Sequence, residues 1–94
     1  MSTFSNRLKQ ARLRKGLSQE ELGLDAGLDP MSASTRMNRY ELGKRSPDFA
    51  LIEKIAEVLE VPAAYFFATD DLLAELILNY GKPPKEQQEL LIKK

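Results

Sequence analysis

The sequence predicts an all-α fold, with a five-helix domain over residues 1–69 and a helical extension over residues 70–94. Apolar residues recur at intervals of three and four along most of the chain, and capping residues and glycines separate these runs. No segment shows the alternating pattern of a strand. Because the chain has 94 residues, 43% of them hydrophobic, we expect one core and not two full domains.

The first helix is expected to start near Phe4 and to stop at Gly16, with Thr3 or Ser5 as its cap. Its apolar face repeats at intervals of four and three, at Phe4, Leu8 and Ala11. A second helix should begin at about Gln19, because Ser18 followed by Glu21 forms a capping-box pattern. It should be short, since Gly27 and then Asp29-Pro30 break the helical pattern.

A third helix is predicted from Met31 or Ser32 to Leu42, with Gly43 as its stop. Its expected buried face consists of Ala33, Met37 and Tyr40, and Leu22 of the second helix should join the same core. Asp48 can cap a fourth helix, in which apolar residues recur at i, i+3, i+4 and i+7: Ile52, Ile55, Ala56 and Leu59. Residues 63–67 are expected to form a short fifth helix that closes the core with Phe66 and Phe67.

The extension is expected to hold a helix that starts at Asp70 or Asp71, where negative charge suits the helix dipole. It carries an apolar stripe longer than the five-helix core should need, made of Leu72, Leu73, Leu76, Ile77 and Tyr80. Gly81, Pro83 and Pro84 should end it, and residues 86–94 are expected to form a last helix with Leu90 and Leu91. Such a stripe offers the self-complementary surface of a two-fold dimer, although it could instead fold back onto its own core.

Composition excludes several classes of protein. The chain has no cysteine and no histidine, which removes disulfides, thiolate or imidazole metal sites and the usual nucleophile and base pairs of hydrolases. We therefore expect no enzyme, no cofactor and no metal site. No secretory signal is visible and no apolar run reaches the roughly 20 residues of a membrane span, so we expect a soluble, cytoplasmic protein.

Charge is unevenly distributed, although the net charge is zero. Residues 1–47 hold nine basic and five acidic side chains, a net charge of +4, and the remainder carries −4. A nucleic-acid surface depends on local basic density, since each neutralised phosphate releases counterions. The asymmetry therefore allows a nucleic-acid partner, although a solvated basic face is an equally good reading of it.

Two sequence motifs then indicate a family. Residues 17–23, LSQEELG, and residues 39–47, RYELGKRSP, resemble the Cro/repressor-type (XRE) helix-turn-helix family, and the resemblance continues to Phe67. It covers about two-thirds of the chain and leaves out residues 70–94. It implies a five-helix lambda-repressor-like domain that binds DNA, with Gly23 at the close approach of two helices and Gly27 at their turn.

The resemblance also implies the residues that meet DNA. The third helix should lie in the major groove and read bases with Ser34, Thr35 and Arg39, flanked by Arg36 and Asn38. Phosphate contacts are implied at the start of the second helix and after the third, at Ser18, Gln19, Lys44 and Arg45. The same matching pairs Arg12 with Glu41 as a structural ion pair.

One departure from the family pattern affects the groove contact. Gly27 and Tyr40 are separated by twelve residues, about four more than is usual in the family. The extra segment, residues 28–32, must either lengthen the turn or extend the start of the third helix. In either case Met31 or Ser32 could meet DNA in place of Ser34 and Thr35.

The expected function is that of a sequence-specific transcriptional regulator, a repressor that binds double-stranded DNA as a homodimer through residues 72–80. An antitoxin on the same fold, with a toxin or other protein partner, would bind DNA in the same way. A protein-interaction adaptor that has lost DNA affinity is the alternative, because fold alone does not fix function. Salt dependence of binding to mixed DNA would separate these readings.

Overall fold

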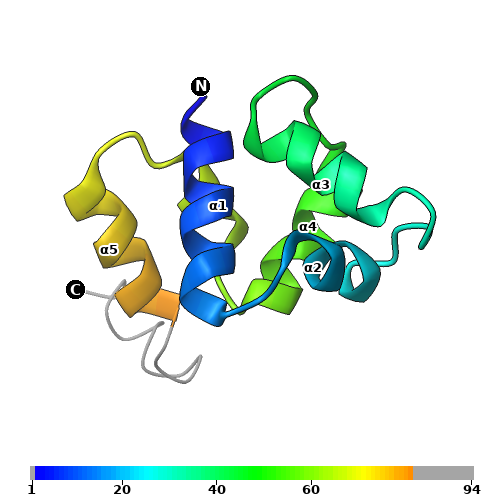
Figure 1. Cartoon of the computed structure of the whole chain (residues 1–94). Coiled ribbons are helices and arrows are strands. Elements are labelled where there is room, and N and C mark those ends of the chain that lie inside the picture. Colours follow the sequence, from blue (N-terminus) through cyan, green and yellow to red (C-terminus); the bar gives the residue numbers. More distant parts are fainter. Residues whose placement is uncertain (1, 82–94) are drawn as a thin grey trace.

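The computed structural model describes residues 2–81, and every regular element in that range is helical. The elements are α1 (Thr3–Lys15), α2 (Gln19–Asp25), α3 (Ala33–Glu41), α4 (Phe49–Leu59), the 3₁₀ helix η1 (Ala63–Phe67) and α5 (Asp71–Gly81). In Figure 1, α1 lies between α5 on one side and the α2–α3 pair on the other. The predicted all-α fold, a five-helix domain followed by a helical extension, is confirmed. The expected helix over residues 86–94 and its Leu90 and Leu91 lie outside the described residues.

The core lies between α1, α3, α4 and η1 and contains one or more side chains from every helix. Its largest fully buried side chains are Leu8, Leu22, Met37, Ile55, Tyr65 and Phe66. The four-three spacing of α1 and the i, i+3, i+4, i+7 spacing of α4 place their apolar residues on this one side. Burial of these side chains is what positions α3 at the surface, with only its inner face in the core.

Helix ends follow the expected capping chemistry at several positions. Ser18 and Glu21 form the predicted capping box, and Asp48 Oδ1 accepts from the Leu51 N–H at 2.8 Å at the start of α4. Asp70 Oδ1 accepts from the N–H groups of Leu72 and Leu73, at 2.7 and 3.1 Å, at the start of α5. The predicted starts of these three helices are therefore confirmed.

The predicted cap of α1 is wrong, because Ser2 caps that helix. Ser2 has an extended backbone, and its Oγ accepts from the Ser5 N–H at 3.2 Å. Thr3 is already helical, and Ser5 is buried in the first turn with its Oγ donating back to the Ser2 carbonyl at 2.9 Å. A serine in the first turn can bond backwards along the chain, so the hydroxyls at 2, 3 and 5 all fit the sequence pattern.

The prediction for Phe67 is also wrong. Phe66 is fully buried, whereas Phe67 is 55% exposed and only covers the ring of Phe4, at a centroid distance of 5.9 Å. A 3₁₀ helix has three residues per turn, so three consecutive side chains point in three directions about 120° apart. Tyr65 and Phe66 take the two directions that face the core, and Phe67 is left on the third, toward solvent.

The inserted residues 28–32 lengthen the turn and do not extend α3, which begins at Ala33. Leu28 is buried and holds the start of the turn, and Asp29 organises the rest of it. Asp29 Oδ1 accepts from the Met31 N–H at 2.9 Å, and the Asp29 carbonyl accepts from the Ser32 N–H at 3.0 Å. The turn is thus a hydrogen-bonded structure that leaves the Met31 side chain 92% exposed.

Candidate nucleic-acid interface

The close crossing of α2 and α3 depends on a glycine. A Cβ built on Gly23 would lie 2.9 Å from both the Cβ and the carbonyl oxygen of Ala33, so any larger residue would push the helices apart. Gly27 ends the α2 segment with φ +90°, a conformation that side chains disfavour. Both roles agree with those implied by the family resemblance, and together they set α3 against α2.

A buried ion pair ties α1 to the end of α3. Arg12 Nε lies 2.6 Å from Glu41 Oε2, and Arg12 Nη2 donates to Glu41 Oε1 at 3.0 Å, so the pair is bidentate. Arg12 Nη1 donates to the Leu17 carbonyl at 2.9 Å, which satisfies the third arm of the guanidinium. The pairing of Arg12 with Glu41 is confirmed, and its part in the site is to fix α3 in place.

The N-terminus of α2 lies beside the C-terminal half of α3. Gln19 Nε2 lies 3.2 Å from both Asn38 Oδ1 and Glu41 Oε1, and donates to both. Ser18 is exposed next to it, with its Oγ accepting from the Glu21 N–H and its N–H donating to Glu21 Oε1. The backbone and side-chain hydrogen bonds of Ser18 hold the pKa of Glu21 below its usual value. One polar edge therefore runs from Ser18 across to Asn38.

The two faces of α3 differ sharply. Its inner face is buried and consists of Ala33, Met37 and Tyr40, as the sequence predicts. Its outer face presents four exposed polar side chains, Ser34, Thr35, Asn38 and Arg39. Arg36 lies between the two faces: it is half-buried, and its Nη2 donates to Tyr40 Oη at 2.9 Å. Four of the five candidate base-reading residues are thus on one solvent-facing surface.

The turn after α3 adds further positive charge. Gly43 has φ +74°, and the N–H of Lys44 donates to the Arg39 carbonyl at 3.0 Å, which closes the helix end. Lys44 and Arg45 are both exposed. A shallow hollow lies here, and its lining includes three arginines but no acidic side chain: Arg36, Arg39, Tyr40, Arg45 and Ser46. Such a hollow suits an anionic group.

Some features of this site were not predicted from the sequence. The spacing of Arg36 and Tyr40 in the sequence allows their hydrogen bond, because residues four apart meet on one helix face. Spacing alone could not choose Tyr40 as the partner of Arg36, since Ser32 is also four residues away, on the other side. The position of Ser46 beside the arginines, and the hydrogen bonds of Gln19 to α3, depend on the tertiary crossing and have no local signal.

Helix α5 is half-embedded. Ala74 and Leu78 are buried in the core and Ile77 packs against it. The other four members of the predicted stripe are exposed: Leu72 by 70%, Leu73 by 47%, Leu76 by 57% and Tyr80 by 38%. The stripe is therefore not consumed by the fold of the chain itself, and it leaves an apolar face on the surface.

Among residues 2–81, no group of three or more acidic side chains is placed to hold a metal ion. No helix in the same range is long and apolar enough to cross a membrane.

Two short helices crossing at a glycine, with a polar outer face on the second and basic residues at its end, define a helix-turn-helix DNA-binding domain. Comparison with known proteins agrees. The family model described as Helix-turn-helix matches residues 8–66, and the chain belongs to this XRE-type helix-turn-helix family of transcriptional regulators. The family is one of DNA-binding regulators and not of enzymes.

Two similar proteins extend beyond the family segment. The SPbeta prophage-derived uncharacterized HTH-type transcriptional regulator YonR of Bacillus subtilis (strain 168) is 28% identical in an alignment 95 positions long. That alignment covers 90% of this chain and 84% of that protein. The crystal structure of the transcriptional regulator BswR is similar with a TM-score of 0.84 and 45% identity, over 95% of this chain and 88% of that one. Both likenesses include the α5 region.

Proposed function

We propose that the chain is a sequence-specific repressor that reads the major groove of double-stranded DNA with α3. The observation that carries this proposal is the division of α3 into a buried apolar face and an exposed polar one. An α-helix fits the major groove of B-DNA, and specificity comes from side chains that reach base edges. The exposed residues of α3 are of the types that make such contacts.

Each base-reading residue has a chemical role in this proposal. Arg39 is assigned a bidentate contact to guanine and Asn38 a contact to adenine, while Ser34 and Thr35 contact bases nearer the start of α3. Thr35 also has a methyl group that can touch a thymine methyl. Arg36 donates through Nη2 to Tyr40, and the donors of its Nη1 are assigned to the edge of a neighbouring base.

The phosphate contacts are assigned to the two ends of this surface. Ser18 and Gln19 lie at the N-terminus of α2, where the helix dipole favours an anion. Lys44 and Arg45 lie at the other end, beside the hollow that Arg36 and Arg39 also line. Contacts at both ends would hold α3 in register along the groove, because phosphate contacts position a protein without reading sequence.

Selection of bound sequences from a random duplex pool tests the proposal. We expect an operator with two half-sites related by a dyad and about one helical turn apart. Binding to it should weaken steeply with salt, and when the operator overlaps a promoter, transcription from that promoter should fall when the protein is added. Failure to enrich any sequence, together with no salt-dependent binding to mixed DNA, would favour the protein-interaction adaptor.

We further propose that the protein binds DNA as a homodimer through the exposed face of α5. Support comes from the exposed apolar side chains Leu72, Leu73, Leu76 and Tyr80, beside which Ile77 is partly buried. A two-fold interface uses the same patch on both copies, and an apolar stripe on one helix satisfies that requirement. The surface could alternatively hold a toxin or another protein partner, in which case the purified chain alone would be a monomer.

The dimer proposal is tested with Leu76→Asp, which places a charge in the centre of the stripe. Because Leu76 is 57% exposed, we expect a folded monomer whose operator affinity falls at least about tenfold. Sedimentation measures the mass and circular dichroism the fold. Asn79→Asp on the same helix is the matched control, since Asn79 is an exposed polar residue outside the stripe. A Leu76→Asp protein that remains a dimer would contradict the proposal.

A further inference from the structure

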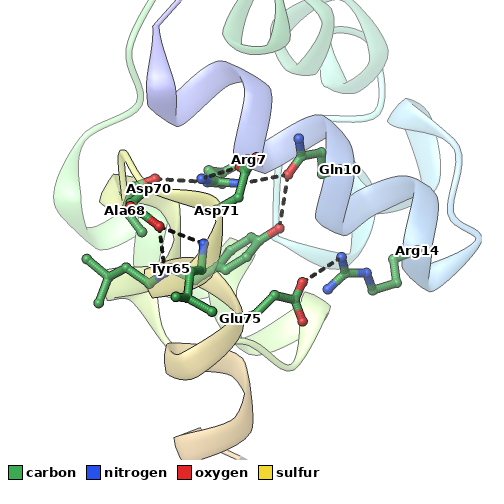
Figure 2. A network of polar contacts seen from close by, with 10 residues as sticks. Arg7, Gln10, Arg14, Tyr65, Ala68, Asp70, Asp71 and Glu75 are labelled. Atoms are coloured by element: carbon green, nitrogen blue, oxygen red, sulfur yellow. Dashed lines mark hydrogen bonds and ion pairs between the residues drawn. The ribbon is translucent and has the colours of Figure 1, made fainter.

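A buried arginine of α1 grips the segment that connects η1 to α5. Arg7 Nε donates to the carbonyl of Ala68 at 2.9 Å, and Arg7 Nη2 lies 3.0 Å from Asp71 Oδ1. Ala68 is the residue at which η1 ends and Asp71 is the first residue of α5. Figure 2 shows the guanidinium between these two points, so a single side chain holds both ends of the connection.

The remaining contacts fix the guanidinium itself. Arg7 Nη1 donates to Gln10 Oε1 at 3.1 Å, and Tyr65 Oη donates to the same oxygen at 3.4 Å. The Arg7 Cζ lies 5.8 Å from the centre of the Tyr65 ring. Figure 2 shows this cluster in the angle between α1 and the start of α5. The planar guanidinium presents its donors in a rigid fork, so three acceptors held at once leave it little freedom.

Burial separates this contact from a second polar contact, which also joins α1 to α5. The Arg7 side chain is 8% exposed. Arg14 and Glu75 also join α1 to α5, but at 3.5 Å and with 57% and 58% of their side chains exposed. An exposed pair of this kind is screened by water and holds geometry weakly. Ala74 and Leu78 also pack α5 against the core, and Arg7 adds a directional polar contact at the start of that helix.

We infer that Arg7 is a positioning residue that fixes the direction in which α5 leaves the DNA-binding domain, and that it thereby sets the half-site spacing that the protein accepts. This inference rests on the proposed dimer through α5. In that dimer the distance between the two α3 helices depends on the angle that each α5 makes with its own domain. A rigid angle permits one separation, whereas a loose one permits several.

Half-site spacing is a sensitive readout of that angle. One added base pair moves a half-site by about 3.4 Å and turns it by roughly a tenth of a helical turn. Contacts of one α3 would then be lost unless α5 reorients. The experiment therefore measures binding of the full chain to its selected operator, and to the same operator with one base pair added to or removed from the central spacer.

Two variants disrupt, in different ways, the contacts that Arg7 makes with Ala68 and Asp71. Arg7→Lys keeps the positive charge and removes the fork, and Asp71→Asn removes the partner charge at a side chain that is 94% exposed. Glu75→Gln is the matched control, because it neutralises the acid of the exposed pair on the same helix. Sedimentation confirms that each protein is a dimer, and circular dichroism that it is folded.

For the parent protein and Glu75→Gln, we expect affinity to fall about tenfold or more when the spacer changes by one base pair. For Arg7→Lys, we expect the three spacers to bind within about threefold of one another. Asp71→Asn keeps an acceptor oxygen at an exposed position and leaves the bonds of Arg7 to Ala68 and Gln10 in place, so we expect a smaller but measurable loss of spacing discrimination. A purely structural role of Arg7 would lower thermal stability and would leave the spacing preference intact. If Arg7→Lys does not fold, Asp71→Asn tests the inference in its place, because a substitution at the exposed Asp71 side chain leaves no cavity in the core.

The inference would be overturned, and the proposed dimer left standing, if Asp71→Asn were folded and dimeric and discriminated between the spacers as strongly as the parent protein. A dimeric parent protein that binds the three spacers equally would overturn the inference and leave the proposed dimer standing, whereas a monomeric parent protein would overturn both.

Discussion

Replacement of Glu41 by glutamine isolates the buried ion pair that holds α3. The change keeps the shape of the side chain and one acceptor oxygen but removes the charge that Arg12 faces at 2.6 and 3.0 Å. Only 3% of the Glu41 side chain and 10% of the Arg12 side chain are exposed, so water cannot replace the lost partner. Removal of one partner of a buried pair typically costs about 3–5 kcal/mol.

We expect Glu41→Gln to lower the free energy of unfolding by about 3 kcal/mol, at the lower end of that range, because glutamine can still accept one of the two hydrogen bonds from Arg12. The free energy of unfolding of a native protein is only about 5–15 kcal/mol, so this loss is a large fraction of it. A loss of 3 kcal/mol corresponds to a fall in Tm of roughly 12–24 °C for a domain of this size.

Urea unfolding followed by circular dichroism measures this loss. Glu75→Gln is the control, because it neutralises the acid of an exposed pair and should cost no more than about 1 kcal/mol. The double variant Arg12→Met/Glu41→Gln should cost less than the two single variants together, since each single change leaves the other partner unpaired. Equal losses for Glu41→Gln and Glu75→Gln would refute the assignment of a structural role to the buried pair.

Two further changes test the α2–α3 unit. Gly23→Ala gains about 1 kcal/mol of helix propensity. However, its Cβ would meet Ala33 at 2.9 Å, so we expect a net loss of up to about 2 kcal/mol in urea unfolding; a variant more stable than the parent would contradict the close crossing. Ser18→Ala should cost about 1 kcal/mol as a lost N-cap, and the pKa of Glu21 should rise only in part, because the main-chain donor remains. Since the folded pKa of Glu21 lies below its unfolded value, the capping box stabilises the fold above about pH 4.3, and that stabilisation is lost as pH falls through the folded pKa. An NMR titration of Glu21 in both proteins checks this, and an identical pKa in both would contradict the side-chain contribution.

Local patterns were sufficient to predict the starts of α2, α4 and α5, because a capping side chain bonds to an N–H only two or three residues away. They were insufficient where two local solutions satisfy the same residues. Pro30 is equally compatible with a longer turn and with a helix that starts at Met31, and the choice was made by the hydrogen bonds of Asp29. The hydroxyls near the N-terminus presented a similar ambiguity, and Ser2 formed the cap.

Features of the site that depend on tertiary contacts were harder to predict. The Arg12–Glu41 pair was predicted only through the family resemblance, since 29 residues separate its members. Arg7 contacts a carbonyl 61 residues away, and nothing in its neighbours distinguishes it from the other basic residues of α1. The outer face of α3, in contrast, follows directly from helical periodicity, because its opposite face had to be buried.

The measurement that tests the central proposal most directly is the effect of Arg39→Ala on two DNAs, the selected operator and mixed-sequence duplex. If α3 reads base edges with Arg39, operator affinity should fall by about 1–3 kcal/mol while affinity for mixed DNA stays nearly unchanged. Equal losses on both DNAs would show that Arg39 contacts only phosphates, and no loss on either would contradict the assignment of Arg39 as a base-reading residue of α3.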